Sequence, residues 1–293
     1  MKTFKQIVLA AALCVGFGAG AAQAPVVQDG IQVKPLPSYR VLASEEKLER
    51  ESQLQYAQLM SKAQEKHALA PDNNPQLIRL RAIAKRIIPY TARWNPDAVK
   101  WQWQVNLLGS KQVNAFCMPG GRIAFFSGII DTLNLTDDEI AAIMGHEISH
   151  ALREHGRARE VKNTGTQILA RLGGAAAAAY FGFDPRLTDS LAQKAGQVVA
   201  LKFSRDDERE ADLIGLDLAS RAGFDPRAGV ALWQKMAALN KRQPLTFLST
   251  HPSGANRIEL INEHMNALLP VYARARSTNV AQLPPYRTTA LPN

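Results

Sequence analysis

The sequence contains almost no cysteine. Only Cys14 and Cys117 occur among its 293 residues, and Cys14 lies in an N-terminal segment that we expect to be removed. The single remaining thiol cannot form an internal disulfide, which excludes a small fold held together by disulfide bonds. We therefore interpret Cys117 as a small buried apolar side chain, with a reactive or metal-linked thiol as the alternative.

Long apolar segments and clusters of basic residues are also missing. After the first 24 residues no run approaches the roughly 20 apolar residues of a membrane-spanning helix, and Arg171 interrupts the Gly- and Ala-rich stretch at 164–183. We expect that stretch to be a packed helix or a flap, with membrane contact as the alternative. The formal net charge is +9, but lysines and arginines are scattered, so the sequence predicts no nucleic-acid partner.

Residues 1–24 have the pattern of an export signal. Lys2 and Lys5 precede an apolar stretch from Ile7 to Phe17, and Ala22-Gln23-Ala24 fits the rule of small residues around a cleavage site. We therefore expect the protein to be exported.

The segment after this signal contains a sheet preceded by helices. Ser44 begins an amphipathic helical pattern that ends near His67, and a second helix is expected over 76–88. Residues 101–107 alternate between apolar and polar, which predicts a half-buried strand. Segments 113–118 and 122–126 flank Pro-Gly-Gly, which is typical of a hairpin. We expect these three strands to form a small antiparallel sheet.

The rest of the sequence is mainly helical in pattern. Thr136-Asp-Asp-Glu139 is a capping box, because the threonine hydroxyl and the glutamate carboxylate can each accept a free backbone N–H. The helix that follows should run through His150 towards Arg157. Further helices are expected over 205–223, 226–239 and 255–268.

Two histidines and a glutamate stand at metal-site spacing on this capped helix. His146 and His150 are four residues apart and therefore share a helix face, so both imidazoles can reach one cation. Glu147 is rotated by about 100° from the first histidine, beside the metal rather than on it. A carboxylate there can take a proton from a water molecule activated by the metal. The His-Glu-x-x-His pattern therefore predicts a catalytic zinc site.

A third protein ligand must come from elsewhere in the chain. His155 follows His150 by five residues without the glycine of the metzincin pattern, so we interpret it as a structural or surface residue. Glu208 and Asp212 share one face of a later helix, and we expect Glu208 to bind zinc and Asp212 to orient a histidine, His146. Glu210 is the rival ligand, but it points to another side of the helix.

Four motifs together resemble one family of zinc metallopeptidases, family forty-eight. This family contains the CaaX prenyl protease, HtpX, the Oma-type mitochondrial proteases and the periplasmic BepA- and LoiP-like proteins. The resemblance covers about residues 77–268 and rests on motifs that occur in family order. They are Asn114-Ala-Phe-Cys-Met-Pro-Gly-Gly121, Gly145-His-Glu-Ile-Ser-His150, Ser204-Arg-Asp-Asp-Glu-Arg-Glu-Ala-Asp212, and Thr250-His-Pro252 with Arg257.

The resemblance implies one Zn²⁺ per chain. It assigns His146, His150 and Glu208 as the metal ligands, and Glu147 as the general base. The chain lacks the membrane spans of HtpX and the tetratricopeptide repeats of BepA-like members, so it is most similar to short, exported, single-domain members.

Other positions receive roles from the same resemblance. His251 matches a histidine near the metal that either caps the fourth zinc position at rest or stabilises the oxyanion during catalysis, and a core or helix-capping histidine is the alternative. Arg257 is expected to anchor this loop or a nearby carboxylate, unless it is an ordinary surface arginine. Asn114 and Ala115 lie on the strand that runs beside the zinc in this family, where an extended substrate can pair with the backbone. A hydrogen bond at the strand end is the alternative for Asn114.

The sequence as a whole predicts a mainly helical α+β fold that is gluzincin-like, with the small sheet beside the active-site helix. We expect a leader and helix at 25–75, a zinc metallopeptidase domain at 76–276 and a flexible tail at 277–293. The expected function is hydrolysis of peptide bonds in unfolded or misfolded envelope proteins, in the periplasm and in association with the outer membrane. The alternative is a chaperone-like periplasmic zinc protein with little proteolytic activity.

Overall fold

A computed structural model describes residues 29–36, 38, 42–158, 203–242, 245–251 and 256–290. The expected export signal and the Gly- and Ala-rich stretch at 164–183 lie outside these residues. Within the described part, no helix has the length and apolar character that crossing a membrane requires.

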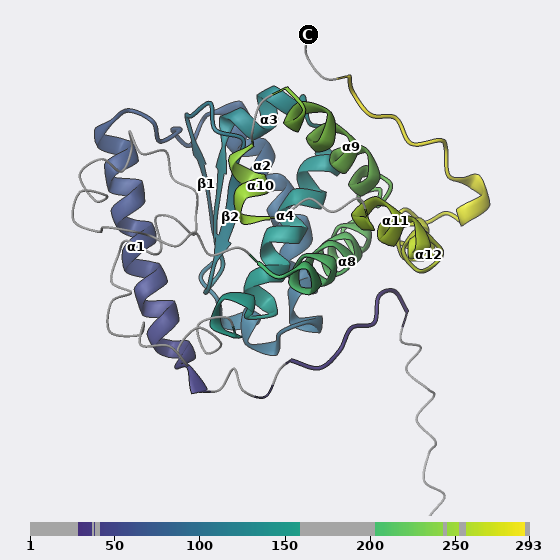
Figure 1. Cartoon of the computed structure of the whole chain (residues 1–293), viewed down its shortest axis with the longest axis horizontal. Coiled ribbons are helices and arrows are strands. Elements are labelled where there is room, and N and C mark those ends of the chain that lie inside the picture. The colour runs from purple at the N-terminus through teal and green to yellow at the C-terminus, as the bar shows by residue number, and fades with distance from the viewer. Residues whose placement is uncertain are drawn as a thin grey trace, which may run out of the picture.

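Helices surround one small sheet (Figure 1). In chain order the described elements are α1 (Glu45–Glu65), α2 (Pro75–Ile87), the 3₁₀ helices η2 (Ile88–Arg93) and η3 (Pro96–Lys100), β1 (Gln104–Leu108), β2 (Ala115–Met118), β3 (Arg122–Phe126), α3 (Ser127–Leu133), α4 (Asp137–Leu152), α8 (Arg205–Arg221), α9 (Ala228–Asn240), α10 (Thr246–Thr250), α11 (Asn256–Glu263), α12 (Met265–Ala275) and the 3₁₀ helix η5 (Val280–Gln282).

The sheet has the order β1-β3-β2 and is mixed, which corrects the expectation of an antiparallel sheet. The hairpin is confirmed, because β2 and β3 pair antiparallel with Ala115 opposite Phe125. However, β3 returns between the other two strands and pairs parallel with β1, with Gln104 opposite Arg122. Alternating polarity indicates which residues of a strand are buried, but it does not fix the direction of its partner. The order leaves β2 at one edge of the sheet.

Each face of the sheet packs against helices, because successive side chains of a strand point to opposite faces and both sets are apolar here. Phe116 and Met118 of β2 pack with Tyr56 of α1 in one apolar cluster. Ala115 and Cys117 face the opposite way, into the main core, which also contains the apolar residues of α2 and α4. Figure 1 shows α1 on one side of the strands, with α2 and α4 on the other. The sheet therefore separates α1 from the helical half of the protein.

Helix α4 begins at the predicted capping box. Thr136 Oγ1 accepts a hydrogen bond from the Glu139 backbone, and the Glu139 carboxylate accepts one from the Thr136 backbone. The helix ends at Leu152, earlier than expected. Glu154 then adopts a positive φ of 51°, which turns the chain back on itself just after the helix.

Two glycines allow α4 and α8 to pack closely. A Cβ atom on Gly145 would lie 2.4 Å from the Gly215 backbone oxygen, and one on Gly215 would lie 2.5 Å from the His146 nitrogen. These distances are shorter than any stable contact, so only glycine fits at both positions. The crossing places the residues that precede Gly215 on α8 beside the His146 side chain.

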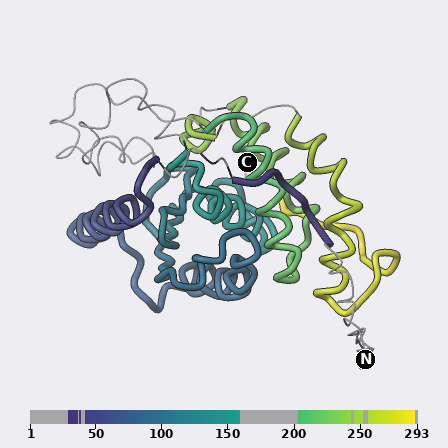
Figure 2. Tube along the Cα trace, turned by 90° about the horizontal axis from the view of Figure 1, so that it is seen from below, coloured from purple at the N-terminus to yellow at the C-terminus, as the bar shows by residue number. Residues whose placement is uncertain are grey.

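The two ends of the described chain lie against this helical core. The segment from Asp29 to Leu36 crosses the helices, as Figure 2 shows, and Arg221 donates hydrogen bonds to Asp29. The tail that we expected to be flexible is hydrogen-bonded as far as Ala290: Lys235 Nζ donates to Thr289 Oγ1 over 2.8 Å, and Tyr286 and Thr136 share a hydrogen bond of 3.1 Å. Its polar partners come from the N-cap of α4 and from α9.

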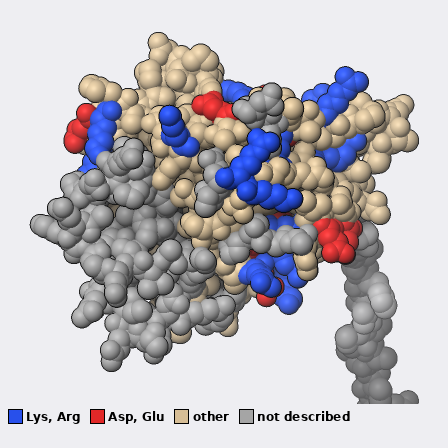
Figure 3. Space-filling view, turned by 45° about the horizontal axis from the view of Figure 1, so that its top comes forward, with Lys and Arg blue, Asp and Glu red and all other residues tan. Residues whose placement is uncertain are grey.

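The expected last helix is divided into α11 and α12, with His264 between them. On the face shown in Figure 3, the described lysines and arginines are spread over the surface with acidic residues among them.

Candidate metal centre

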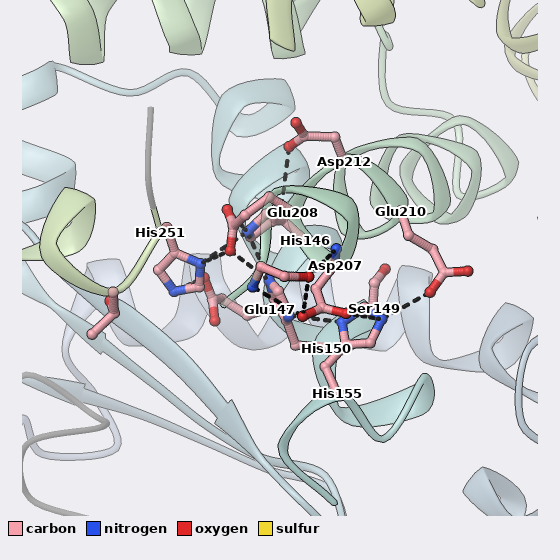
Figure 4. A network of polar contacts seen from close by, with 12 residues as sticks. His146, Glu147, Ser149, His150, His155, Asp207, Glu208, Glu210, Asp212 and His251 are labelled. Carbon is pink, nitrogen blue, oxygen red and sulfur yellow. Dashed lines mark hydrogen bonds and ion pairs between the residues drawn. The ribbon is translucent and has the colours of Figure 1, made fainter. Parts of the chain in front are cut away.

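Four buried side chains direct their ligand atoms at one point. His146, His150, Glu208 and His251 each offer one nitrogen or oxygen, and these atoms all lie within 4.8 Å of one another. The two histidines come from α4, the glutamate from the first turns of α8, and His251 from the residue that follows α10. Figure 4 shows the convergence of these side chains. It is the only such cluster among the residues that the structure describes.

The distances in this cluster suit a zinc ion. The His146 Nε2 atom lies 3.1 Å from His150 Nε2 and 3.2 Å from His251 Nδ1, and His251 Nδ1 lies 3.0 Å from Glu208 Oε1. Ligand atoms about 2.0–2.1 Å from a tetrahedral zinc are about 3.3 Å from one another. Three imidazoles and one carboxylate are also donors that zinc accepts.

At three of the four side chains the electrostatic environment favours the protonation state that a metal ligand needs, whereas at His251 burial is outweighed by Glu147 and Glu208, which raise the pKa of the ring. Burial lowers the pKa of His146 and lowers that of His150 well below its ordinary value, so both rings are neutral. Burial alone would raise the pKa of Glu208, but His251, His146 and Arg257 together lower it, so this carboxylate is ionised. Neutral imidazole and ionised carboxylate are the forms that bind a cation.

Glu147 lies beside the cluster without belonging to it. Burial raises the pKa of Glu147 to about 7, while the nearby His251 acts in the opposite direction. Its Oε1 atom is buried without a hydrogen-bond partner among the described residues, and His251 Nε2 lies 3.5 Å away. A carboxylate whose pKa is near neutrality can both accept and return a proton.

An ionic network holds His146 from behind. Asp212 Oδ1 lies 3.1 Å from His146 Nδ1, and Arg257 donates two hydrogen bonds of 2.6 Å to the Asp212 carboxylate. Arg257 also donates to Glu208 Oε2 over 2.6 Å, and its guanidinium stacks on the Trp233 ring. Its side chain is 4% exposed, which excludes the surface alternative for Arg257. We call Asp212 and Arg257 the Asp212 network.

A different network lies behind His150. The His155 Nδ1 atom is 2.9 Å from His150 Nδ1, and His155 Nε2 is 2.8 Å from Glu210 Oε2. Arg153 donates to Glu210 Oε1 over 3.0 Å. We call His155, Glu210 and Arg153 the His155 network. Sequence reasoning missed it, because His155 fits no ligand spacing and Glu210 is on another side of α8 from Glu208. His155 is buried, so its surface interpretation is wrong, and Glu210 is not among the clustered ligand atoms.

The cleft in front of the metal cluster is almost closed. It is bounded on one side by residues 114–117, which are Asn114 and the first three residues of β2, and on the other by Glu147, His150, Phe203, Thr250 and His251. The Phe203 ring stacks on His150 at 3.8 Å between centroids. The cleft encloses about 10 Å³, the room of roughly one water molecule. Asn114 and Ala115 line it, and so does the buried Cys117.

Comparison with known proteins agrees with this geometry. The sequence model of peptidase family M48 matches residues 78–265. The chain belongs to this family. Members of family M48 are zinc metallopeptidases, so the cluster of His146, His150, Glu208 and His251 is suited to hold one Zn²⁺. The family resemblance and the expected cofactor are thereby confirmed.

Individual relatives extend the comparison. The mitochondrial metalloendopeptidase OMA1 of Schizosaccharomyces pombe is 31% identical over 216 residues, which are 73% of this chain and 60% of the relative. The metalloprotease LoiP of Escherichia coli is 30% identical over 69% of this chain and 75% of its own length. The beta-barrel assembly-enhancing protease of Yersinia pestis is 29% identical over 60% of this chain and 37% of its own length.

The chain spans less than half of the length of some other relatives. It covers 34% of the OMA1 protein of Arabidopsis thaliana and 43% of the OMA1 protein of Bos taurus.

Proposed function

We propose that the protein is a zinc-dependent metalloendopeptidase. The observation that carries this proposal is the buried convergence of His146, His150 and Glu208 with the Glu147 carboxylate beside them, in a chain of family M48. When bound, zinc supplies a Lewis acid that makes water more acidic and polarises the scissile carbonyl. Glu147 accepts the proton of the attacking water and returns it to the departing amine.

His251 has the position of a cap on the metal cluster. Its Nδ1 atom lies among the ligand atoms, 3.2 Å from His146 Nε2 and 3.0 Å from Glu208 Oε1. Its other nitrogen faces Glu147. With zinc bound, His251 would hold the fourth ligand position and keep water from it. A His251 ring that leaves this position but stays beside Glu147 would be near enough to stabilise the oxyanion, so the two roles suggested by the sequence would belong to a resting and a working state of the enzyme.

The substrate that suits this site is an extended polypeptide. Strand β2 is at the edge of the sheet and borders the cleft, so its backbone can pair with a substrate strand. Asn114 and Ala115 would then lie beside the substrate backbone. Recognition through backbone hydrogen bonds tolerates varied sequences, as in unfolded or misfolded proteins. Because the cleft has room for only about one water molecule, it must open before a peptide enters.

The proposed location is the periplasm, with the outer membrane as the site of association. The support is the signal-like pattern of Lys2, Lys5 and the apolar stretch that follows them. In that location the substrates are misfolded envelope proteins.

The test is cleavage of casein by zinc-loaded wild type and by Glu147→Gln. The amide cannot accept the proton of water, so we expect the rate to fall by about 10²- to 10⁴-fold. Zinc content should stay unchanged, because Glu147 is outside the cluster of ligand atoms. Glu51→Gln, an exposed change on α1, is the matched control and should cleave at the wild-type rate. Both comparisons are repeated with His251→Ala, which opens the fourth ligand position.

The alternative is a chaperone-like zinc protein that rarely cuts. The nearly closed cleft is compatible with this alternative, because a latent protease and a zinc protein without activity would both have a closed cleft. If zinc-loaded wild type and the His251→Ala variant never cleave faster than their Glu147→Gln counterparts, the protease proposal fails and the alternative stands.

A further inference from the structure

The orientation of His150 leaves one ring nitrogen outside the metal cluster. Its Nε2 atom faces inward, 3.1 Å from His146 Nε2 and 3.5 Å from Glu208 Oε1. Its Nδ1 atom therefore faces outward, where His155 Nδ1 lies at 2.9 Å. An imidazole that binds a metal through one nitrogen keeps its proton on the other. The group that accepts this proton fixes how the ring is turned.

The hydrogen bonds of the His155 network then have only one consistent direction. His150 Nδ1–H donates to His155 Nδ1, so the proton of the neutral His155 ring is on Nε2. That Nε2–H donates to Glu210 Oε2, which lies 2.8 Å away. The other oxygen of Glu210 accepts from Arg153. Every polar atom of the His155 ring thus has a partner, and the chain of hydrogen bonds ends on a carboxylate that a guanidinium neutralises.

The fold holds His155 in this position from several sides. Glu154, at a positive φ, turns the chain after α4 so that the His155 ring, 5% exposed as a side chain, lies against His150. Glu210 comes from α8 and Arg153 from the end of α4. Arg153 also donates to the Lys34 carbonyl over 2.5 Å, which ties the network to the segment that crosses the helices near the N-terminus. Figure 4 shows His155 between His150 and Glu210.

We propose that His155 is a positioning residue of the zinc site: it accepts the outward proton of His150, and Glu210 and Arg153 hold it in place. It neither binds zinc nor contacts substrate. The inference rests on the zinc site of the proposed function and not on peptide hydrolysis. The His155 network thus does for His150 what the Asp212 network does for His146. The difference is that a histidine stands between the ligand His150 and the carboxylate of Glu210.

The experiment measures zinc affinity by competition with a chelator and the visible spectrum of the cobalt-substituted protein. His155→Phe keeps the ring volume but removes both hydrogen bonds, and we expect zinc affinity to fall by about 10- to 100-fold with a changed cobalt spectrum. In His155→Asn the amide oxygen can still accept from His150, so most of the affinity should remain. His264→Phe changes a half-buried histidine that bonds to the Leu260 carbonyl, and it should match wild type in both measurements.

Two results would overturn the proposal. One is a folded His155→Phe protein with wild-type zinc affinity and an unchanged cobalt spectrum. The other is an equal loss in His155→Asn and His155→Phe, which would mean that packing, and not the hydrogen bond to His150, is what matters.

A second measurement decides the question if His155→Phe does not fold. Glu210→Gln should weaken zinc binding in the wild-type background but have little effect in His155→Asn, because the shorter side chain no longer connects Glu210 to His150. Independent, additive effects of the two changes would refute the proposal. A wild-type protein that binds no zinc would instead refute the zinc site itself, so the two failures can be told apart.

Discussion

The two α4 histidines of the metal cluster are held by networks of different character. Behind His146, Asp212 and Arg257 form a buried ion pair in which each side chain is 4% exposed. Behind His150, a histidine stands between the ligand and Glu210, whose side chain is 21% exposed. Burial raises the cost of leaving a charge unpaired. The Asp212 network should therefore contribute to both folding and zinc affinity, and the His155 network mainly to the orientation of one ring.

The largest difference should appear when each arginine is removed. Arg257→Met leaves Glu208 and Asp212 buried without their common counter-ion, which we expect to lower the free energy of unfolding by about 3–5 kcal/mol. Arg153→Met removes one partner of Glu210, which still contacts His155 and solvent, and one donor to the Lys34 carbonyl, so the loss should be about 1–2 kcal/mol. Urea unfolding with zinc chelated measures both. Equal losses would contradict the contrast between the two networks.

A smaller effect is expected at the helix crossing that brings the Asp212 network to His146. A methyl group on Gly215 would meet the His146 backbone nitrogen at 2.5 Å, and backbone cannot move aside cheaply. Gly215→Ala should therefore cost about 1–3 kcal/mol of stability or more. The matched control is Gly229→Ala, where the methyl group meets only the flexible end of the Leu216 side chain at 2.9 Å. Thermal unfolding should show the larger loss for Gly215→Ala; the reverse order would mean that the helices can separate freely.

The finest comparison concerns zinc affinity alone. Asp212→Asn keeps an oxygen near His146 but removes the charge that binds Arg257, and we expect zinc affinity to fall by about 10- to 100-fold. Glu210→Gln acts on His150 only through His155, so its effect should be smaller. Chelator competition on the two folded variants ranks them. A larger loss of zinc affinity in Glu210→Gln than in Asp212→Asn would contradict the expectation that a carboxylate in direct contact with a ligand histidine matters more than one that acts through a second histidine.

Much of the fold was accessible from local patterns. The capping boxes at Thr136 and Ser204 predicted the starts of α4 and α8, because a cap satisfies backbone groups within four residues of itself. The sheet was predicted with the wrong pairing, since the insertion of β3 between β1 and β2 depends on contacts between segments distant in sequence. The sequence predicted a loose tail after Ser277 because this segment contains proline. No local pattern indicates its hydrogen-bond partners Lys235 and Asn134, which are far away along the chain.

The candidate site shows the same division. Residues four apart share a helix face, so the spacing alone places His146 and His150 on one face of α4. In the same way it places Glu208 and Asp212 on one face of α8, before any tertiary contact is known. No spacing rule predicts His155, which reaches His150 only through the turn at Glu154.

The sequence by itself determined the family, the metal ligands to be tested and the helices that carry them, because helix periodicity and capping act over a few residues. Only the tertiary structure decided which partner stands behind each histidine and how closed the cleft is. Those features depend on the close crossing of α4 and α8 at Gly145 and Gly215 and on the chain reversal after α4. The helix first recognised by its two histidines is therefore one half of the site, and the packing of α8 against it supplies the other.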